Sequence, residues 1–388
     1  MLQRLAAVAI LMITASSSAS MAHTDTSIWE SWPTIVAPQP QTQAYQQPHR
    51  EFTPSRQGSF QPQFQLAAYH PAAPPRDGAI QHGLRSLAKL LERRNPWENT
   101  PLMGNSVTHG MLAETVQALL NWNGPLLPET LSRQFDLLPI DSAKGQGLGD
   151  FTGYFTPELN GSRIRTGRFK TPVYKMPPRK LANASHADIA NGVLTGRGLE
   201  IAWVDNPFAL YIAQVQGAAL IHFTDGSQSL IDYAGNNGKP FSSVSSYLLK
   251  TGYKRGSLSN AEINNWLHEH PEKIREVLTS NPRYIFFKET NAIPTTASGN
   301  GVIPGHTIAV DNHHIPHGAV LLAELPRFDG NGNPTGTEWR VLFAQDRGKD
   351  IRGKGRMDLY LGIGQAAETA AYRISGAHRT YLLMRKPG

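Results

Sequence analysis

The sequence predicts a mainly β fold with a few peripheral helices, and two observations support this class. From about residue 150 onward, short apolar segments are separated by Gly and Pro, as in sheets joined by tight turns. Two pairs of these segments flank turn-forming sequences and predict β-hairpins. Helical spacing of apolar residues is confined to a few stretches, so helices are expected at the periphery.

The first ordered elements are predicted to be two helices. Four leucines between residues 84 and 91 recur at helical spacing, so order is expected to begin near Ile80. Residues 111–122 repeat the pattern. Strands are expected to follow from about residue 150.

The two hairpins are marked by their turns. Residues 220–224 and 229–233 flank an Asp-Gly pair, which tolerates positive φ. Residues 319–325 and 339–344 flank a run of Asp, Gly and Asn at 329–333. Each pair is therefore expected to form an antiparallel ribbon.

A helical stretch separates the two hairpins. Ser259 and Glu262 have the spacing of a capping box, which predicts a helix over residues 261–270. Pro271 then opens a second helix. Residues 284–287 predict a buried strand.

The N-terminus has the layout of a secretory signal peptide over residues 1–22. Arg4 supplies positive charge, residues 5–15 are apolar but too short to span a bilayer, and residues 20–22 form a small-x-small cleavage site. Residues 23–79 are rich in Pro and Gln and predict a disordered or extended tether. We therefore expect an exported, periplasmic protein.

Composition narrows the class further. The chain has 388 residues and no cysteine, so it must rely on a large core rather than on disulfides. Without a cysteine at the cleavage site we predict no lipid anchor, and a protein that is soluble or peripherally associated with the outer membrane. The net charge of +7 favours acidic partners. Cell-wall polymers with carboxylates suit an exported protein better than nucleic acid, which is not an expected partner. The sequence does not indicate which proteins of the cell envelope bind this chain.

Two aspartates are the candidate catalytic residues. Asp358 lies inside the apolar run 357–361, and a carboxyl group among apolar neighbours is expected to have a raised pKa. A general acid that works near neutral pH needs such a shift. Asp346 follows another apolar strand, 341–344, so two acids can meet at one site. On the pattern alone, a pair of structural aspartates explains these positions at least as well.

The loop between the two aspartates is strongly cationic. It carries Arg or Lys at positions 347, 349, 352, 354 and 356, against one acid, Asp350. Nearby positive charge lowers the pKa of a carboxyl group and opposes its use as a general acid. The sequence leaves open whether these cations face Asp358 or the solvent.

An ordered series of short motifs runs from about residue 150 to the C-terminus. It comprises GYFTP at 153–157, PVYKMPP at 172–178, QVQG at 214–217, YAGNNG at 233–238, NPRYIFF at 281–287, AVD at 309–311, IPHG at 315–318 and the segment 346–364. In this order the motifs resemble the membrane-bound lytic murein transglycosylase A family.

The resemblance implies a double-psi β-barrel with a smaller β-rich domain inserted into it and a glycan-binding groove between them. The barrel is then expected over residues 80–156 and 289–388, and the insertion over residues 157–288.

The resemblance also assigns site residues. The catalytic aspartate of the family falls on Asp358, and a second aspartate of the site falls on Asp346. The groove motifs nominate Tyr154, Thr156 and Gln216 for sugar contacts.

The reaction that the resemblance implies needs only one acid. A lytic transglycosylase uses the C6 hydroxyl of N-acetylmuramic acid (MurNAc) as the nucleophile, so the attack is intramolecular. Asp358 would protonate the oxygen of the MurNAc-β-1,4-GlcNAc bond and then accept the hydroxyl proton, which leaves a 1,6-anhydro end. Peptidoglycan glycan strands are the expected substrate, and no cofactor or metal is expected.

Two other functions fit the same sequence. Asp346 and Asp358 could form the carboxylate pair of a glycoside hydrolase, about 6.5–9.5 Å apart in an inverting enzyme. The chain could also be a non-catalytic relative that binds peptidoglycan.

Two weaker signals predict no further site. Residues 362–367 match a Gly-x-Gly-x-x-Ala dinucleotide pattern, but no ribose-binding acid and no second nucleotide-binding half follow. A tight strand-to-helix turn is expected there instead. Four histidines between residues 306 and 317 are irregularly spaced, so a metal site is not expected.

Overall fold

The computed structural model describes residues 76–256, 258–290 and 293–387. The predicted signal peptide and residues 23–75 of the predicted tether lie outside these residues. The first described element is α1 (Arg76–Leu91), which starts slightly before the expected Ile80. Residues 76–79 therefore belong to this helix and not to a tether, because Ala79 packs into the apolar core.

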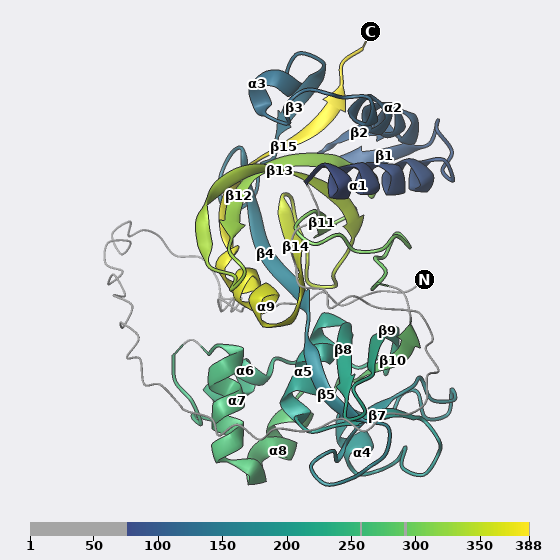
Figure 1. Ribbon diagram of the computed structural model, residues 1–388, viewed down its shortest axis with the longest axis vertical. Coiled ribbons are helices and arrows are strands. Elements are labelled where there is room, and N and C mark those ends of the chain that lie inside the picture. The colour runs from purple at the N-terminus through teal and green to yellow at the C-terminus, as the bar shows by residue number, and fades with distance from the viewer. Residues whose placement is uncertain (1–75, 257, 291–292, 388) are drawn as a thin grey trace, which may run out of the picture. The chain divides into compact units, whose positions relative to one another are not determined.

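A closed six-stranded β-barrel forms the larger sheet (Figure 1). Its strand order is β12-β13-β11-β14-β4-β15, and β15 pairs back onto β12 to close the barrel. The pairings β11 with β13 and β14 with β4 are parallel, and the other four are antiparallel. The strands are β4 (Leu148–Thr156), β11 (Thr307–Val310), β12 (Val320–Phe328), β13 (Pro334–Asp346), β14 (Arg356–Ile363) and β15 (Gly376–Arg385), with β3 (Phe135–Pro139) added beside β15.

Helices and a small hairpin pack on this barrel. Helix α1 crosses β13 at Gly83, where any Cβ would overlap the ring of Phe343, so a glycine is required for the close approach. Phe135, Phe151 and Phe343 are completely buried in the core. The remaining elements here are β1 (Asn99–Leu102), β2 (Asn105–Thr108), α2 (His109–Leu120), α3 (Pro128–Leu131) and α9 (Gly364–Arg373).

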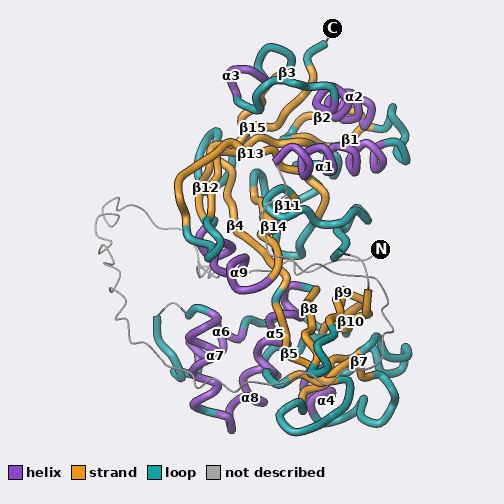
Figure 2. Tube along the Cα trace, viewed as in Figure 1, coloured by secondary structure: helices purple, strands orange, loops and turns teal. Residues whose placement is uncertain are grey.

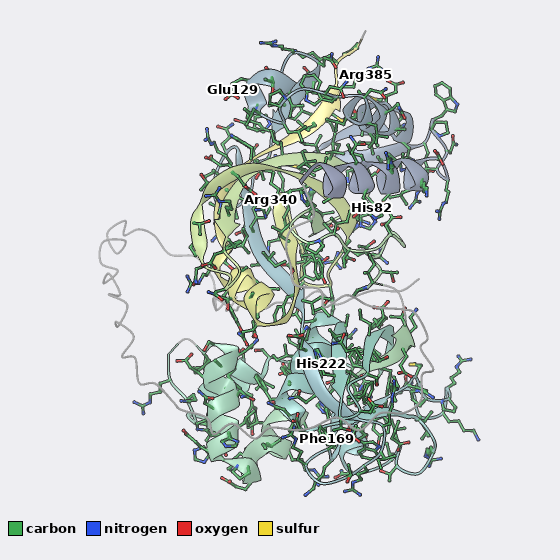
Figure 3. All side chains as sticks on the ribbon, in the orientation of Figure 1. His82, Glu129, Phe169, His222, Arg340 and Arg385 are labelled. Atoms are coloured by element: carbon green, nitrogen blue, oxygen red, sulfur yellow. The ribbon has the colours of Figure 1, made fainter. Side chains whose placement is uncertain are left out.

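A second sheet has the strand order β10-β9-β8-β5-β7-β6. Figure 2 shows its strands in orange with helices α5 to α8 in purple, and Figure 3 labels His222 on this sheet and Arg340 on the barrel. Its strands are β5 (Glu158–Ser162), β6 (Thr171–Tyr174), β7 (Glu200–Val204), β8 (Ala218–Phe223), β9 (Gln228–Asn236) and β10 (Ile285–Thr290). Its helices are α4 (His186–Ala190), α5 (Pro207–Gln216), α6 (Val244–Lys250), α7 (Asn260–Glu269), the 3₁₀ turn η1 (Pro271–Lys273) and α8 (Ile274–Thr279).

Strands β1 and β2 lie between the two predicted helices, and β3 also precedes residue 148, so the expectation that both helices precede the first strands is wrong. The other locally encoded elements are confirmed. Strands β8 and β9 form the first hairpin, and β12 and β13 form the second. Ser259 and Glu262 make both hydrogen bonds of the capping box at the start of α7. The fold class, mainly β with a barrel and a smaller β-rich region, is also confirmed. Among the described residues, no helix combines the length and apolarity needed to cross a lipid bilayer.

Helix α5 is the main element that the sequence did not predict. Asn206 caps it, Pro207 opens it, and Gly217 ends it in the left-handed conformation, so its end signals are present in the sequence. Most of its residues are buried, and a short, continuously apolar segment cannot be distinguished from a strand by periodicity.

Candidate active site

Both candidate aspartates lie on strands of the barrel that flank β11. Ala309 on β11 pairs with Asp346 on β13 and with Asp358 on β14. On the far side of β14, Asp358 pairs with Thr152 on β4. Paired residues on neighbouring strands share a face of the sheet, so these four side chains form one row across four strands.

A β-bulge places Asp346 in this row. Ile308 pairs with Ala344, but the next residue, Ala309, pairs with Asp346, so Gln345 is an extra residue in β13. Without the bulge, Asp346 would point to the opposite face of the sheet. The alignment of these four side chains therefore depends on a β-bulge that has no signal in the sequence.

Asp358 is completely buried and has two dissimilar oxygens. Oδ1 accepts a hydrogen bond of 2.7 Å from the hydroxyl of Thr152. Oδ2 is buried and has no hydrogen-bond partner among the described residues. Burial raises the pKa of Asp358 to about 7, whereas the Thr152 hydrogen bond and the charge of Arg356 lower it and the charge of Asp346 raises it. Asp358 can therefore both give and take a proton near neutral pH.

Two of the five loop cations are engaged by partners other than this carboxyl group. Lys354 forms an ion pair with Asp141 (3.4 Å), and the Nε of Arg352 donates to the backbone oxygen of Lys349. Arg356 is the loop cation whose charge lowers the pKa of Asp358. Burial outweighs it, so the conflict between apolar surroundings and a cationic loop is resolved in favour of a raised pKa.

Arg356 also fixes the direction of the Thr152 hydrogen bond. Its Nη2 donates to the Thr152 hydroxyl oxygen at 2.9 Å. Because the guanidinium occupies an acceptor position on that oxygen, the hydroxyl proton is directed to Oδ1 of Asp358.

Asp346 is equally buried, but both of its carboxyl oxygens have hydrogen-bond partners. Oδ1 accepts from the backbone N–H groups of Ala297 and Arg347, both at 2.9 Å. Oδ2 accepts from the hydroxyl of Tyr154 at 3.1 Å. Nε2 of His317 donates to the backbone oxygen of Asp346 at 3.0 Å. Burial lowers the pKa of His317, so this histidine is neutral at pH 7. Asp346 is therefore held by several donors and raises the pKa of the neighbouring Asp358.

The predicted sugar-contact residues are buried and make internal hydrogen bonds. Tyr154 and Thr156 lie on the same face of β4 as Thr152, since they are two and four residues further along the strand. The Tyr154 ring lies 5.1 Å from that of Tyr360, and the hydroxyls of Thr156 and Tyr360 are 2.9 Å apart. Gln216, at the end of α5, accepts from the backbone N–H of Phe155 at 3.3 Å.

Several residues of this site are not among those predicted from the sequence. Thr152 and Tyr360 each lie two residues from a nominated residue on the same strand, so strand alternation could have revealed them. In the sequence, Arg356 is one of five cations in the loop, and its position there does not distinguish it from the others. Ala297 and His317 carry no local signal, because the fold brings them to Asp346 from distant parts of the chain.

The Gly-x-Gly-x-x-Ala pattern at residues 362–367 and His306 of the histidine group both make contacts within the fold. Gly362 and Gly364 adopt positive φ in the turn from β14 to α9, as expected. A Cβ at Gly364 would lie 2.5 Å from Oε2 of Glu158, so an acid already occupies the space near this helix start. His306 is held by the backbone oxygen of Val341 at 2.8 Å. In the part of the chain that the structure describes, His, Cys, Asp and Glu form no group of three or more that could hold a metal ion.

Two family models match the chain. The MltA specific insert domain matches residues 150–288, and the 3D domain matches residues 306–384. Among solved structures, MltA of Escherichia coli with bound chitohexaose has a TM-score of 0.68 at 29% identity, covering 81% of this chain and 91% of that one. The membrane-bound lytic murein transglycosylase of Agrobacterium tumefaciens has a TM-score of 0.63 at 25% identity, covering 80% and 95%.

Named relatives agree with these matches. Membrane-bound lytic murein transglycosylase A of Escherichia coli K12 is 35% identical over 263 residues, which cover 66% of this chain and 72% of the relative. The protein of the same name from Vibrio cholerae is 33% identical over 247 residues, which cover 62% and 67%. The chain therefore belongs to the membrane-bound lytic murein transglycosylase A family.

Proposed function

We propose that the chain is a peptidoglycan lytic transglycosylase in which Asp358 acts alone as general acid and general base. The observation that carries the proposal is the asymmetry of this carboxyl group. One oxygen is held by Thr152, and the other is buried without a partner among the described residues. Its pKa of about 7 allows either protonation state at neutral pH.

The reaction proceeds in two proton transfers. Protonated Asp358 gives its proton to the oxygen of the MurNAc-β-1,4-GlcNAc bond, and the bond from C1 of MurNAc to that oxygen breaks. The C6 hydroxyl of the same MurNAc forms a new bond to C1, and its proton passes to the Asp358 carboxylate. The products are a GlcNAc with a free 4-hydroxyl and a 1,6-anhydro-MurNAc end. The acid is regenerated, and no water is consumed.

The role of Asp346 follows from its hydrogen bonds. Three donors contact its two carboxyl oxygens, so both oxygens of Asp346 are held in place, whereas Oδ2 of Asp358 has no partner among the described residues. The charge of Asp346 raises the pKa of Asp358. It also anchors Tyr154. This engagement disfavours the two-carboxylate hydrolase, which needs a second available carboxylate.

The sugar-contact residues stay part of the proposal. Tyr154 and Thr156 continue the row of polar groups along β4, on the face that carries Asp358. Gln216 fixes the backbone next to them. The Escherichia coli relative was solved with chitohexaose, which supports a glycan strand as the ligand.

We also propose the location and the domain limits that the sequence indicates. A barrel over residues 80–156 and 289–388 and an insertion over 157–288 are supported by the membership of the two sheets, although β10 of the second sheet extends two residues past this limit, to Thr290. An exported, periplasmic enzyme, soluble or peripherally attached to the outer membrane, is supported by the signal-peptide pattern at residues 1–22 and by relatives named membrane-bound.

Digestion of purified sacculi with mass spectrometry of the products tests the function. The wild-type chain should release 1,6-anhydro muropeptides, and Asp358→Asn should release none while keeping its fold. Asp350→Asn changes an exposed acid of the same loop and should retain full activity. Muropeptides with reducing ends would instead identify a hydrolase. A wild-type chain that binds sacculi as well as Asp358→Asn but releases nothing would identify a non-catalytic binding protein.

A further inference from the structure

A basic segment without acids lies at the edge of the second sheet. Residues 159–187 contain seven Arg and Lys side chains and no Asp or Glu. They include the edge strand β6 and the loops on both sides of it. Arg163 and Arg168 form ion pairs with Glu289 and Asp205, so part of this charge is neutralised within the fold.

A cavity of about 340 Å³ lies between this segment and helices α5 and α8. Three cations from different parts of the chain line it: Arg165 and Lys170 before β6, and Arg275 on α8. None of the residues that line the cavity is an Asp or Glu. Glu200 is near enough to contribute, after burial, to the raised pKa of Tyr174, but it does not line the cavity.

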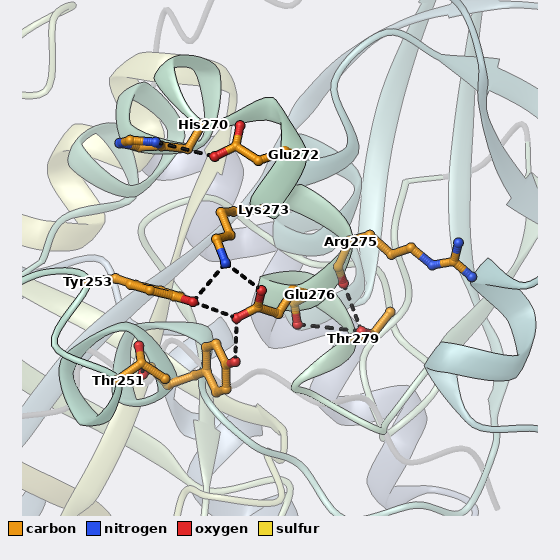
Figure 4. Close-up of polar contacts among 9 residues, drawn as sticks. Thr251, Tyr253, His270, Glu272, Lys273, Arg275, Glu276 and Thr279 are labelled. Atoms are coloured by element: carbon orange, nitrogen blue, oxygen red, sulfur yellow. Dashed lines mark hydrogen bonds and ion pairs between the residues drawn. The ribbon is translucent and has the colours of Figure 1, made fainter.

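The three cations are exposed and available to a ligand. Arg275 extends away from its neighbour Glu276, which accepts instead from Lys273, Tyr247 and Tyr253 (Figure 4). The guanidinium of Arg165 lies 5.6 Å from the centre of the Trp203 ring. In the described residues, Arg165, Lys170 and Arg275 form no ion pair.

The inner wall of the cavity is aromatic and carries polar groups. Tyr174, Gln214 and Tyr284 line it and are at least 95% buried. Burial lowers the pKa of His186 to about 4, so this side chain is neutral and adds no charge at pH 7. Trp203 contributes a partly exposed apolar surface. Cations at the rim and aromatic hydroxyls inside suit a small ligand with both anionic and apolar parts.

We infer that this cavity binds a short peptide that carries free carboxylates, such as the stem peptide of a muropeptide. The inference rests on the proposed function, because stem peptides are attached to the MurNAc sugars of the glycan strand. A neutral sugar would gain nothing from three cations. A nucleic acid or a membrane surface offers charge over a wide area and does not enter a concave site of this size.

Titration of the Asp358→Asn chain with the tripeptide L-Ala-γ-D-Glu-meso-diaminopimelate tests the inference. Binding should change the tryptophan fluorescence, and this change should disappear in a background with Trp203→Phe. Affinity should fall with added salt, because the cations are exposed. The double variant Lys170→Gln/Arg275→Gln should bind about tenfold more weakly, as expected for the loss of two exposed charge pairs.

Matched controls separate charge from other effects. Lys250→Gln on α6 removes one exposed cation away from the cavity and should leave the affinity unchanged. The tripeptide with its carboxylates amidated should bind at least tenfold more weakly. Equal affinity for the amidated peptide, or equal affinity of the double variant, would overturn the inference. So would inorganic phosphate that displaces the peptide at comparable concentration, since the cavity would then be a simple anion site.

Failure of this inference and failure of the proposed function give different results. Digestion of peptide-free glycan strands by the wild-type chain reports the reaction at Asp358 alone. Anhydro products without peptide binding would refute only the cavity inference. Peptide binding without anhydro products would refute only the proposed reaction.

Discussion

The hydroxyl of Thr152 donates a 2.7 Å hydrogen bond to Oδ1 of Asp358, and the guanidinium of Arg356 donates to the same hydroxyl at 2.9 Å. This chain of donors holds one oxygen of a buried carboxyl group and leaves the other without a partner among the described residues. The two oxygens of Asp358 are therefore distinguished by their neighbours, and both neighbours also lower the pKa of Asp358 against the effect of burial.

Substitution of Thr152 tests whether this hydroxyl orients Asp358. Thr152→Val keeps the shape but removes the donor, so kcat should fall about tenfold, as expected for one lost hydrogen bond. The pKa of Asp358 should rise, because the lost hydrogen bond lowers it. Thr152→Ser restores the donor and should recover most of the rate. Equal rates and pH profiles for the valine and serine variants would rule out this role.

Removal of the Arg356 charge should shift the pH profile upward. Asp358 must be protonated to act as the acid, so activity is lost as pH rises through its pKa of about 7. Arg356→Gln removes a charge that lowers this pKa, so the alkaline limb of kcat/KM should move to higher pH. Lys354→Gln is the matched control, because Lys354 pairs with Asp141 and should leave the limb in place. A downward shift for Arg356→Gln would contradict the assignment.

Removal of the Asp346 charge should shift the profile in the opposite direction. The negative charge of Asp346 raises the pKa of Asp358, so Asp346→Asn should move the alkaline limb to lower pH. The rate should also fall, because an amide cannot accept from the Tyr154 hydroxyl and both backbone donors as a carboxylate does. Complete loss of anhydro products by a variant that keeps its fold would instead assign Asp346 a direct part in the chemistry.

The stability of the fold should depend on pH through Asp358. Its pKa is raised from 3.8 in the unfolded chain to about 7 in the folded chain, so the folded state binds an extra proton between these values. The free energy of unfolding should therefore fall as pH rises from about 4 to about 7, by up to about 4 kcal/mol. Urea denaturation of Asp358→Asn should show a shallower fall over this range. Parallel curves for the two proteins would exclude an ionising Asp358 as the cause.

Gly153 tests the packing that supports the site. A Cβ at this position would lie 2.6 Å from the backbone of Ala371, so α9 can pack on β4 only over a glycine. Gly153→Ala should lower the free energy of unfolding by about 1–3 kcal/mol through overpacking. Gly78→Ala is the control, because a Cβ there meets nothing within 4 Å, and it should be neutral or stabilising by up to about 1 kcal/mol. Similar denaturation midpoints for the two variants would refute the close approach.

The local elements could be predicted from the sequence, and so could the strand position of Asp358, which we propose as the catalytic acid. The two hairpins, the capping box of α7 and the strand that carries Asp358 depend on neighbouring residues, and so they could be predicted from turn types and periodicity. The ordered motifs supplied the family. Helix α5 escaped prediction because a short apolar run is compatible with both a helix and a strand.

The difference between the two aspartates depends on contacts between distant parts of the chain. From the sequence both are acids at apolar strands, but Asp346 receives donors from Ala297 and Tyr154, whereas Asp358 receives one from Thr152. A bulge at Gln345 sets which face Asp346 occupies. The pKa of a carboxyl group depends on its distance from water and on donors brought in from elsewhere in the chain, and neither is encoded in adjacent residues. For that reason the cationic loop, which dominates the local sequence, has less effect on Asp358 than its burial within the barrel.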